Sequence, residues 1–305
     1  MTVDGFDTVG IVSPAGELRA EFVPAANMLC HTLTHRDVER LDPGHGVRAY
    51  AERGKTMGIP LLYPWANRLA EPAYRAAGRE VRLPGPDGRY PVDPNGLPIH
   101  GALPGLLRWE TEASGGGDRL RARLAWDGPE LTPLFPFEHE VEYEARAEDD
   151  RLHVTLTVRA TGGGPVPVSF GFHPYLTLPG VPREEWEIGL GATERLLLDG
   201  HSIPTGAREP LEPRRFRLAD QDWDDALAGL ADPPAFSAAA EGRGVTVTFG
   251  EGYRFAQVYT PAGRQFICFE PMVAPTNALR DGTALTVVEP GGEHRAAFVI
   301  ALTDN

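Results

Sequence analysis

Two neighbouring segments alternate strictly between apolar and polar residues, and this pattern constrains the fold more than any other feature of the chain. In residues 151–159 (RLHVTLTVR) every second side chain is apolar, and residues 138–146 (EHEVEYEAR) alternate valine, tyrosine and alanine with charged residues. A period of two places the apolar set on one face of a strand. Because Asp149 and Asp150 separate the segments, we predict an antiparallel hairpin with one face in the core and the other in solvent.

The same strand-like character recurs along the rest of the chain, at residues 119–126, 244–249, 254–260, 264–270, 285–290 and 294–302. Helical patterns are confined to residues 48–53 and 222–230 (DWDDALAGL). The 35 glycines and 29 prolines fall mainly between the strand segments, as tight connections require. We therefore predict an all-β fold, a large antiparallel sandwich with few short helices, formed by a single domain over residues 1–305.

The charge and the apolar pattern argue against several kinds of partner. The formal net charge is -14, whereas nucleic acids and anionic membranes attract basic surfaces. No segment approaches the roughly 18 consecutive apolar residues of a membrane-spanning helix, and the start of the chain lacks a signal-peptide pattern. We expect a cytoplasmic protein, a monomer or homodimer, that binds neither nucleic acid nor a membrane.

Three segments break the strand pattern and hold the candidate functional residues. Residues 57–72 are apolar and end in Asn67 and Arg68, residues 93–105 place His100 among glycines and prolines, and residues 168–180 place His173 between Phe172 and Pro174. Each has the character of a rigid loop that delivers a polar group from an apolar surround. Sites on sheet scaffolds are commonly built in this way.

His100 and His173 differ from the other histidines, because each is embedded in small, apolar or ring residues. A core histidine with one hydrogen bond and an imidazole held for chemistry are both open alternatives. We assign His139 and His153 to the polar faces of strands. The remaining five lie in polar or turn-rich surroundings and are expected at the surface: His31, His35, His45, His201 and His294.

Three charged residues are also open to either a structural or a functional role. Arg68 is either half of a structural ion pair or a clamp for a hydroxyl or an anion. Glu270 follows the apolar run FICF, where a carboxylate is costly to bury unless it is hydrogen-bonded or used. Asp224 either caps the predicted helix or contributes to a site.

Metal and cofactor chemistry lack their usual sequence patterns. His100, His173 and Glu270 are far apart in the sequence with no HxH or HxD pair, and Cys30 and Cys268 lie outside any CxxC spacing. Cys268 is expected to be a small buried hydrophobe. The chain has no GxSxG elbow, P-loop or dinucleotide fingerprint. We predict no metal and no cofactor, which leaves proton transfer by an acid and a base.

Four motifs in this order carry a resemblance to a known family: PLLYPWANRL (60–69), IHGALPG (99–105), FGFHPYLTL (170–178) and FICFEPMVAPTNAL (266–279). Together with residues 20–33 they resemble the aldose 1-epimerase (galactose mutarotase-like) family over nearly the whole chain. The resemblance implies a β-supersandwich and the reversible interconversion of α and β anomers of an aldose, with neither cofactor nor metal.

The resemblance also implies roles for individual residues. His173 matches the proton donor of the family and Glu270 its proton acceptor. Tyr175 lies in the same loop as the donor, and Gln265 is a weak match to a glutamine that contacts sugar. The positions that resemble substrate-binding ones are Asn67, Arg68, His100, Tyr175 and Asp224.

The motifs depart from those of the best-known galactose mutarotases, and the departures put the identity of the sugar in doubt. FGFHPY stands where those enzymes have a TNHxYF-like stretch, and the segment before Glu270 is short. We expect a neutral aldose such as glucose or galactose. One alternative is an anionic sugar, a hexose 6-phosphate or a sulfonated sugar, held by Arg75 and Arg79 together with Arg68. Another is a non-catalytic carbohydrate-binding protein of the same fold.

Overall fold

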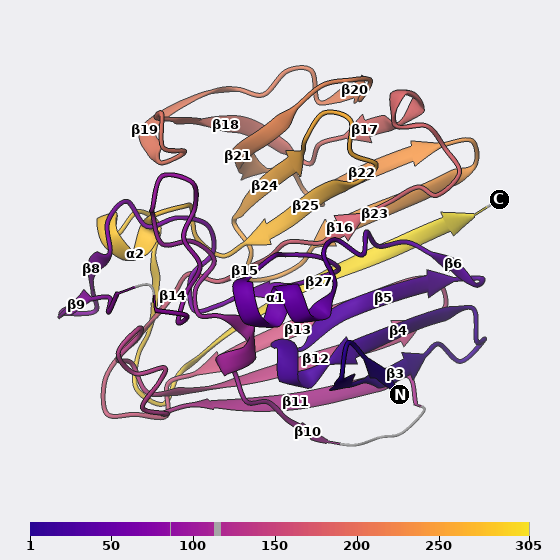
Figure 1. Ribbon diagram of the computed structural model, residues 1–305. Helices are drawn as coiled ribbons and strands as arrows, with labels where there is room; N and C mark the ends of the chain where they lie inside the picture. Colours follow the sequence, from indigo (N-terminus) through magenta and orange to yellow (C-terminus); the bar gives the residue numbers. More distant parts are fainter. Residues whose placement is uncertain (86, 113–116, 305) are drawn as a thin grey trace.

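Two large antiparallel sheets face one another in the computed structural model, which describes residues 1–85, 87–112 and 117–304 (Figure 1). Aromatic side chains join the sheets. The rings of Phe172 and Phe298 lie 5.0 Å apart, and those of Phe236 and Phe269 lie 6.0 Å apart. The predicted all-β supersandwich is confirmed. That the whole chain, residues 1–305, forms one domain stays a prediction.

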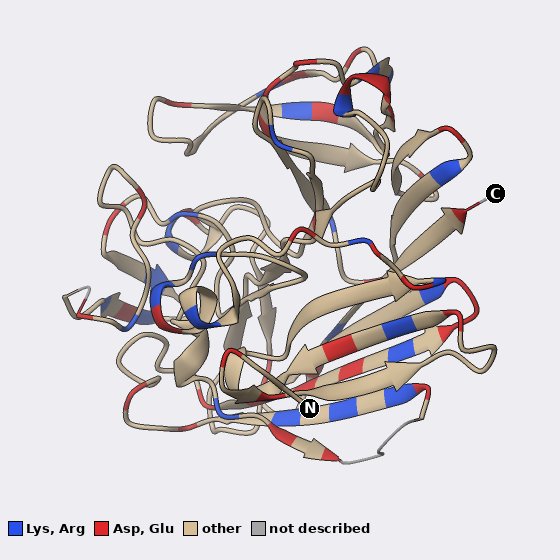
Figure 2. Ribbon diagram, turned by 45° about the vertical axis from the view of Figure 1, so that its right-hand side comes forward, with Lys and Arg blue, Asp and Glu red and all other residues tan. Residues whose placement is uncertain are grey.

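The first sheet has nine strands and contains the predicted hairpin. In spatial order its strands are β10 (Glu110–Glu112), β11 (Arg119–Trp126), β12 (His139–Glu148), β13 (Arg151–Arg159), β27 (Glu293–Asp304), β23 (Arg243–Phe249), β22 (Ala235–Ala240), β17 (Glu187–Gly189) and β20 (Arg215–Arg217). Exposed and buried residues alternate along β11, and Figure 2 shows the resulting bands of acidic and basic residues across neighbouring strands. The alternation that predicted the hairpin therefore marks the solvent face of this sheet.

The second sheet has eight strands and carries most of the candidate site. Its order is β19 (Pro204–Pro210), β18 (Ala192–Leu198), β21 (Trp223–Leu230), β24 (Phe255–Thr260), β25 (Ile267–Met272), β15 (Gly171–Phe172) and β7 (Leu61–Leu62), and β16 (Tyr175–Leu176) also pairs with β25. β25 is buried along its whole length. Since an entirely buried strand has no outward polar face, the apolar run FICF gave no alternation to read.

Smaller elements cover the rest of the first sheet. A four-stranded sheet of β3 (Val9–Val12), β4 (Leu18–Val23), β5 (Leu29–His35) and β6 (Val38–Glu39) packs on β11–β13, with the rings of Phe22 and Tyr143 6.1 Å apart (Figure 1). Three strand pairs complete the strands: β1 (Thr2–Val3) with β2 (Phe6–Asp7), β8 (Ala73–Ala76) with β9 (Arg79–Arg82), and β14 (Val166–Val168) with β26 (Thr286–Val288).

Helices are short, as the sequence predicts. They are α1 (Val47–Arg53) and α2 (Ala278–Asp281), with 3₁₀ turns η1 (Pro24–Ala26), η2 (Pro104–Leu106) and η3 (Arg183–Glu185). The first matches the helix expected at residues 48–53. Among the described residues, no helix has the length and apolar character needed to cross a membrane.

The helix predicted over residues 222–230 is wrong, because this segment forms strand β21. Its alanines and leucines favour a helix locally, but both of its edges are paired in register, with β18 on one side and β24 on the other. The two hydrogen-bonding neighbours and the burial of Ala226, Leu227 and Ala228 outweigh helix propensity. Asp224 consequently sits on a strand and caps no helix.

Two histidines expected at the surface are buried. His139 begins β12 with the same parity as Val141, so it points into the core, where it hydrogen-bonds the Tyr63 hydroxyl. The Nδ1 of His35 lies 2.7 Å from Asp304 on β27. The polar neighbours of these residues in sequence misled the prediction, since the face of the strand decides burial.

Candidate active site

A pocket of about 260 Å³ opens on the eight-stranded sheet, and all seven residues singled out from the sequence line it. Its lining consists of Thr56, Asn67, Arg68, Ile99, His100, His173, Tyr175, Asp224, Gln257, Tyr259 and Glu270. Residues more than 200 positions apart in the sequence thus meet at one place. Two other cavities, of about 290 and 560 Å³, have no histidine in their linings. The roles assigned to the seven residues stay predictions.

Two cross-strand rows on one face of the sheet lie beneath the pocket, and all of their members except Cys268 line it. In the first row Asp224 on β21 pairs with Tyr259 on β24, which pairs with Cys268 on β25. Gln257 and Glu270 form the second row, two residues further along. Side chains two apart on a strand share a face, so the rows stand next to one another under the pocket.

The loops that carry Asn67 and His100 are tied together through their backbones. The His100 N–H donates to the Asn67 carbonyl at 2.9 Å, and Arg68 and Ile99 form an antiparallel bridge. The next residue, Gly101, has φ +77° and lies so close to Tyr63 that an added Cβ would meet its carbonyl oxygen at 2.1 Å. Glycine is required here because the backbone approaches so closely.

Arg68 both forms an ion pair and faces the pocket, so the two alternatives are compatible. Its Nε donates to Asp93 Oδ2 at 2.9 Å, with side chains 18% and 1% exposed. Burial raises the pKa of Asp93, but hydrogen bonds from the Leu97 N–H and from Arg68 outweigh it and leave that pKa below its usual value. The pair uses only the Nε–H, which leaves the end of the guanidinium toward the pocket.

His173 is held by its backbone and by a parallel ring. Its N–H donates to the Pro60 carbonyl at 3.1 Å, and the imidazole stacks on Tyr175 with centroids 4.6 Å apart and an angle of 2°. The Tyr175 hydroxyl lies 2.6 Å from Thr56 Oγ1. Two residues earlier, a Cβ on Gly171 would meet the Met272 sulfur at 2.1 Å, so only glycine lets this loop approach β25.

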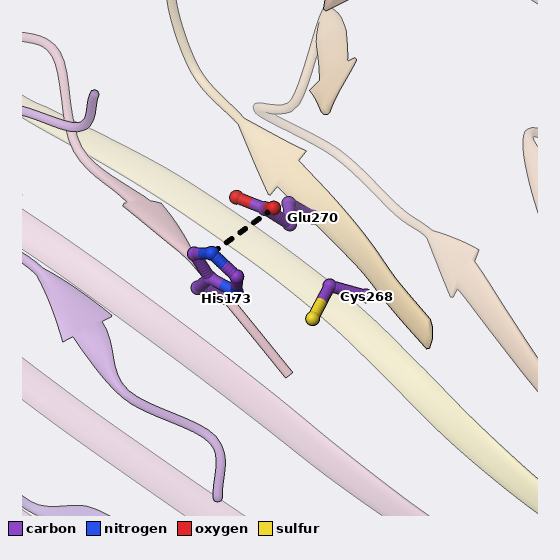
Figure 3. Close-up of side chains that lie close together, drawn as sticks. All are labelled: His173, Cys268 and Glu270. Carbon is purple, nitrogen blue, oxygen red and sulfur yellow. Dashed lines mark ion pairs between the residues drawn. The ribbon is translucent and has the colours of Figure 1, made fainter. Parts of the chain in front are cut away.

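Glu270 is a buried carboxyl whose oxygens have no hydrogen-bond partner among the described residues. His173 lies beside it, with Nε2 3.3 Å from Glu270 Oε1 (Figure 3). Burial and then the nearby Asp224 raise the pKa of Glu270 well above its usual range. A buried acceptor without a partner costs about 1–3 kcal/mol, which favours a functional role for this carboxyl.

Burial favours the neutral forms of both His173 and Glu270 in the sugar-free pocket. It lowers the pKa of His173 to about 3, while that of Glu270 is raised. Burial thus favours the titrating proton on the carboxyl over the imidazole. Moving that proton from Glu270 to His173 gives the charged form of the same pair, so both forms hold one proton.

His100 lies edge-on to His173, with ring centroids 5.8 Å apart and an angle of 82°. Burial, and then the neighbouring His173 and Arg68, hold the pKa of His100 well below its usual range. Its Nδ1 has no hydrogen-bond partner in the described part of the chain. A neutral imidazole with an unused nitrogen is suited to exchange a hydrogen bond with a ligand.

Sequence analysis missed Thr56, Gln257 and Tyr259. Gln257 donates to Asp224 Oδ1 at 2.7 Å and fixes that carboxylate. A glutamine inside the apolar strand FAQVYT was the available signal, but its inward direction depends on pairing with β25. The weak candidate Gln265 is exposed and outside the pocket lining, so the glutamine of this pocket is Gln257.

The fold also gathers three potential metal ligands that the sequence keeps apart. One donor atom each from His173, Cys268 and Glu270 lie within 4.8 Å of one another (Figure 3). The predicted absence of a metal cofactor stays a prediction. That prediction rests on the separation of the potential ligands along the sequence, whereas the fold brings three of them close together.

Comparison with known proteins gives concordant matches. The model of the aldose 1-epimerase family matches residues 31–301. Among curated proteins, the uncharacterized protein YihR of Escherichia coli (strain K12) is 27% identical over 251 residues, 79% of this chain and 77% of that protein.

Solved structures with little sequence identity share the fold. The Slr1438 protein of Synechocystis has a TM-score of 0.79 at 23% identity, covering 100% of this chain and 98% of that one. A GalM/aldose epimerase homologue from C. elegans has a TM-score of 0.79 at 16% identity, covering 98% and 100%.

Proposed function

The chain belongs to the aldose 1-epimerase family, and we propose that it interconverts the α and β anomers of a free, neutral aldose by general acid–base catalysis. The observation that carries the proposal is the His173–Glu270 pair, 3.3 Å apart on the floor of a pocket lined by polar groups. Mutarotation moves protons on two oxygens bonded to the same carbon. An acid and a base must therefore lie close together.

The pair completes the reaction with a single proton. In ring opening, Glu270 takes the proton of the C1 hydroxyl while His173 gives its proton to the ring oxygen, and the C1–O5 bond breaks to leave an aldehyde. Rotation about C1–C2 exposes the other face of the carbonyl. Closure reverses the transfers: Glu270 returns its proton to the carbonyl oxygen, His173 takes the C5 hydroxyl proton, and the C1–O5 bond forms again.

The protonation favoured by burial fits this cycle. After ring opening Glu270 is protonated and His173 is neutral, which is the form that the apolar surround prefers. A bound pyranose places hydroxyl groups against the carboxyl and the imidazole, and hydrogen bonds to the charged form offset part of its cost. The pocket thus lowers the energy of the open-chain stage while the sugar itself supports the starting stage.

The other predicted residues hold the sugar. His100, Asn67, Arg68 and Asp224 surround the acid–base pair and offer donors and acceptors to ring hydroxyls. Gln257 occupies one oxygen of Asp224, which leaves the other to accept from a hydroxyl. The pocket volume is slightly below the range of about 300–1,000 Å³ typical of drug-sized ligands, as a monosaccharide requires.

The charges of the pocket favour a neutral sugar over an anionic one. Arg68 is the one arginine in the lining and already shares its charge with Asp93, whereas Asp224 and Glu270 are both acidic. Arg75 and Arg79 do not line the pocket, and Arg79 donates to the Pro136 carbonyl instead. A phosphate or sulfonate therefore lacks the multiple arginines that recognise such groups.

A non-catalytic sugar-binding role has less support. Recognition of hydroxyls alone has no need of a buried imidazole and carboxyl 3.3 Å apart, as His173 and Glu270 are. Absence of a cofactor, a cytoplasmic location and a monomeric or homodimeric state remain our predictions.

Single anomers test the proposal. Freshly dissolved α-D-glucose, α-D-galactose and their 6-phosphates are followed by polarimetry or NMR with and without the protein. We expect faster equilibration of a neutral sugar. A 6-phosphate converted far faster than its parent sugar contradicts the choice of substrate, and no acceleration with any aldose contradicts the enzyme proposal.

A further inference from the structure

We propose that His173, Cys268 and Glu270 form a site for a soft divalent metal ion such as Zn²⁺, and that an ion bound there switches off the acid–base pair. The site differs from a cofactor site, because the metal-free protein is the active form. Metal binding itself is independent of the proposed function; only its inhibitory consequence rests on that function.

The three donor groups converge on one point. One donor atom from each lies within 4.8 Å of the others, and His173 Nε2 is 3.3 Å from Glu270 Oε1. Zinc bonds of about 2.0–2.1 Å to nitrogen and oxygen and about 2.3 Å to sulfur set tetrahedral ligands roughly 3.3–3.7 Å apart. The His173–Glu270 pair already has this spacing. The Cys268 sulfur lies within 4.8 Å of the other donors and needs to approach them by up to roughly 1.3 Å to complete it.

The positions of the ligands in the fold make such a movement small. Cys268 and Glu270 are two apart on β25 and share one face, and Cys268 pairs with Tyr175 on β16, two residues after His173. His173 and Glu270 line the pocket, while Cys268 is buried just beyond them (Figure 3). An ion entering the pocket meets the first two ligands and then the thiol.

Unused polar atoms at the site favour an ion. Both Glu270 oxygens are buried without hydrogen-bond partners among the described residues. A cation bound by the carboxylate supplies the missing partner and repays part of the burial cost of that group. Three protein ligands leave a fourth tetrahedral position open to the pocket.

The ligand set selects soft ions over hard ones. One sulfur, one nitrogen and one oxygen suit Zn²⁺ and Cd²⁺, whereas Mg²⁺ and Ca²⁺ prefer oxygen ligands alone. Binding requires thiolate and carboxylate forms, so the ion displaces the proton of Cys268 and the proton held by the His173–Glu270 pair. Inhibition follows because the ion occupies the His173 nitrogen and the Glu270 oxygen that would otherwise exchange protons with the sugar.

Two cysteine variants test the site with a matched control. Cys268→Ala removes the sulfur ligand, whereas Cys30→Ala removes the other buried thiol, which donates to the Thr32 carbonyl on β5 and does not line the pocket. Binding of Zn²⁺ to chelator-treated protein is measured by calorimetry. Co²⁺ is used as a spectroscopic substitute, because a cobalt–thiolate bond gives a charge-transfer absorption band.

We expect one equivalent of Zn²⁺ and a cobalt–thiolate band in the wild-type protein and in Cys30→Ala. Cys268→Ala should lose the band and bind Zn²⁺ more than about tenfold more weakly, since even a partner outside the ligand shell is worth that much. Cys268→Ser keeps nearly the original volume and should behave like Cys268→Ala, provided that thermal melting shows both folded.

Absence of stoichiometric binding to the wild-type protein, or equal binding by Cys268→Ala, overturns the site. Loss of mutarotation on chelation overturns the inhibitory role, because the metal is then required. The binding readouts need no turnover, so a protein that binds Zn²⁺ but accelerates no anomerisation sinks the proposed function and leaves the site intact. An active protein that gives no cobalt–thiolate band overturns the metal site and leaves the proposed function intact.

Discussion

The His173 Nε2 lies 3.3 Å from Glu270 Oε1, although the two side chains are only 8% and 1% exposed. Neighbouring groups of this kind usually form a charged pair, but burial here favours the neutral form of each. The two residues therefore share one titrating proton, and the position of that proton depends on what fills the pocket. Several measurements follow from this property.

Glu270→Gln should stabilise the protein in a pH-dependent way. Since the folded pKa of Glu270 is raised by burial, the wild-type protein loses stability as pH rises from the ordinary carboxyl pKa toward the folded value. Glutamine does not titrate, so the variant should gain about 1–3 kcal/mol relative to wild type at pH 8 and much less at pH 4.5. Chemical denaturation at both pH values measures this, and an equal difference at the two would be evidence that Glu270 titrates normally.

The pH profile of kcat/KM should lack an acid limb near pH 6.5. Burial lowers the pKa of His173 to about 3, so the imidazole takes up no second proton until the solution is strongly acidic. The pair then loses its one proton only as pH rises through the raised pKa of Glu270. Initial rates between pH 4.5 and 9 test this; a fall in rate centred near pH 6.5 would show an ordinary histidine.

The ring of Tyr175 should matter more than its hydroxyl. Tyr175→Phe keeps the stacked contact with His173 but loses the hydroxyl, which bonds Thr56 Oγ1 at 2.6 Å and lies 3.5 Å from His173 Nε2. We expect kcat to fall by about tenfold, the cost of an ordinary hydrogen bond. Tyr175→Ala frees the imidazole and should lower kcat much further, because a misplaced catalytic group is costly. Similar kcat values for the two variants would show that stacking on the Tyr175 ring does not position the His173 imidazole.

Arg68→Ala should raise KM for a neutral sugar more than it changes kcat, because Arg68 binds and carries no proton. The variant should also lose about 1–3 kcal/mol of stability, since Asp93 is left buried without its arginine. Arg75→Ala, an exposed arginine outside the pocket, is the control and should change neither quantity. A drop in kcat alone for Arg68→Ala would assign this residue to the chemical step.

The sequence indicates the site well because the polar residues of the site differ from the apolar residues around them in the sequence. Asn67, His100 and His173 stand in proline- and glycine-rich loops among apolar residues, and Glu270 ends an apolar run, so each is conspicuous locally. All of them line the pocket. Thr56 has no such local signal. The glutamine inside FAQVYT is a local signal, but the direction of Gln257 is set by strand pairing with a distant segment.

The wrong predictions have the same origin. The composition of residues 222–230 favours a helix, and only β18 and β24 on either side make the segment a strand. His139 stands among glutamates, but its parity with Val141 turns it into the core. The closeness of Cys268 to His173 likewise depends on the pairing of β16 with β25. Local sequence patterns reveal the periodicity of a segment but not the distant segments with which it pairs.

The most direct test of the account is kcat for α-to-β conversion by Glu270→Gln at saturating sugar, with His173→Asn beside it. Glutamine keeps size and hydrogen bonding but accepts no proton, so kcat should fall by about 100- to 10,000-fold with little change in sugar affinity. Glu289→Gln, at an exposed position, is the matched control and should equal wild type. A folded Glu270→Gln protein that kept near-wild-type kcat would contradict the assignment of Glu270 as the base.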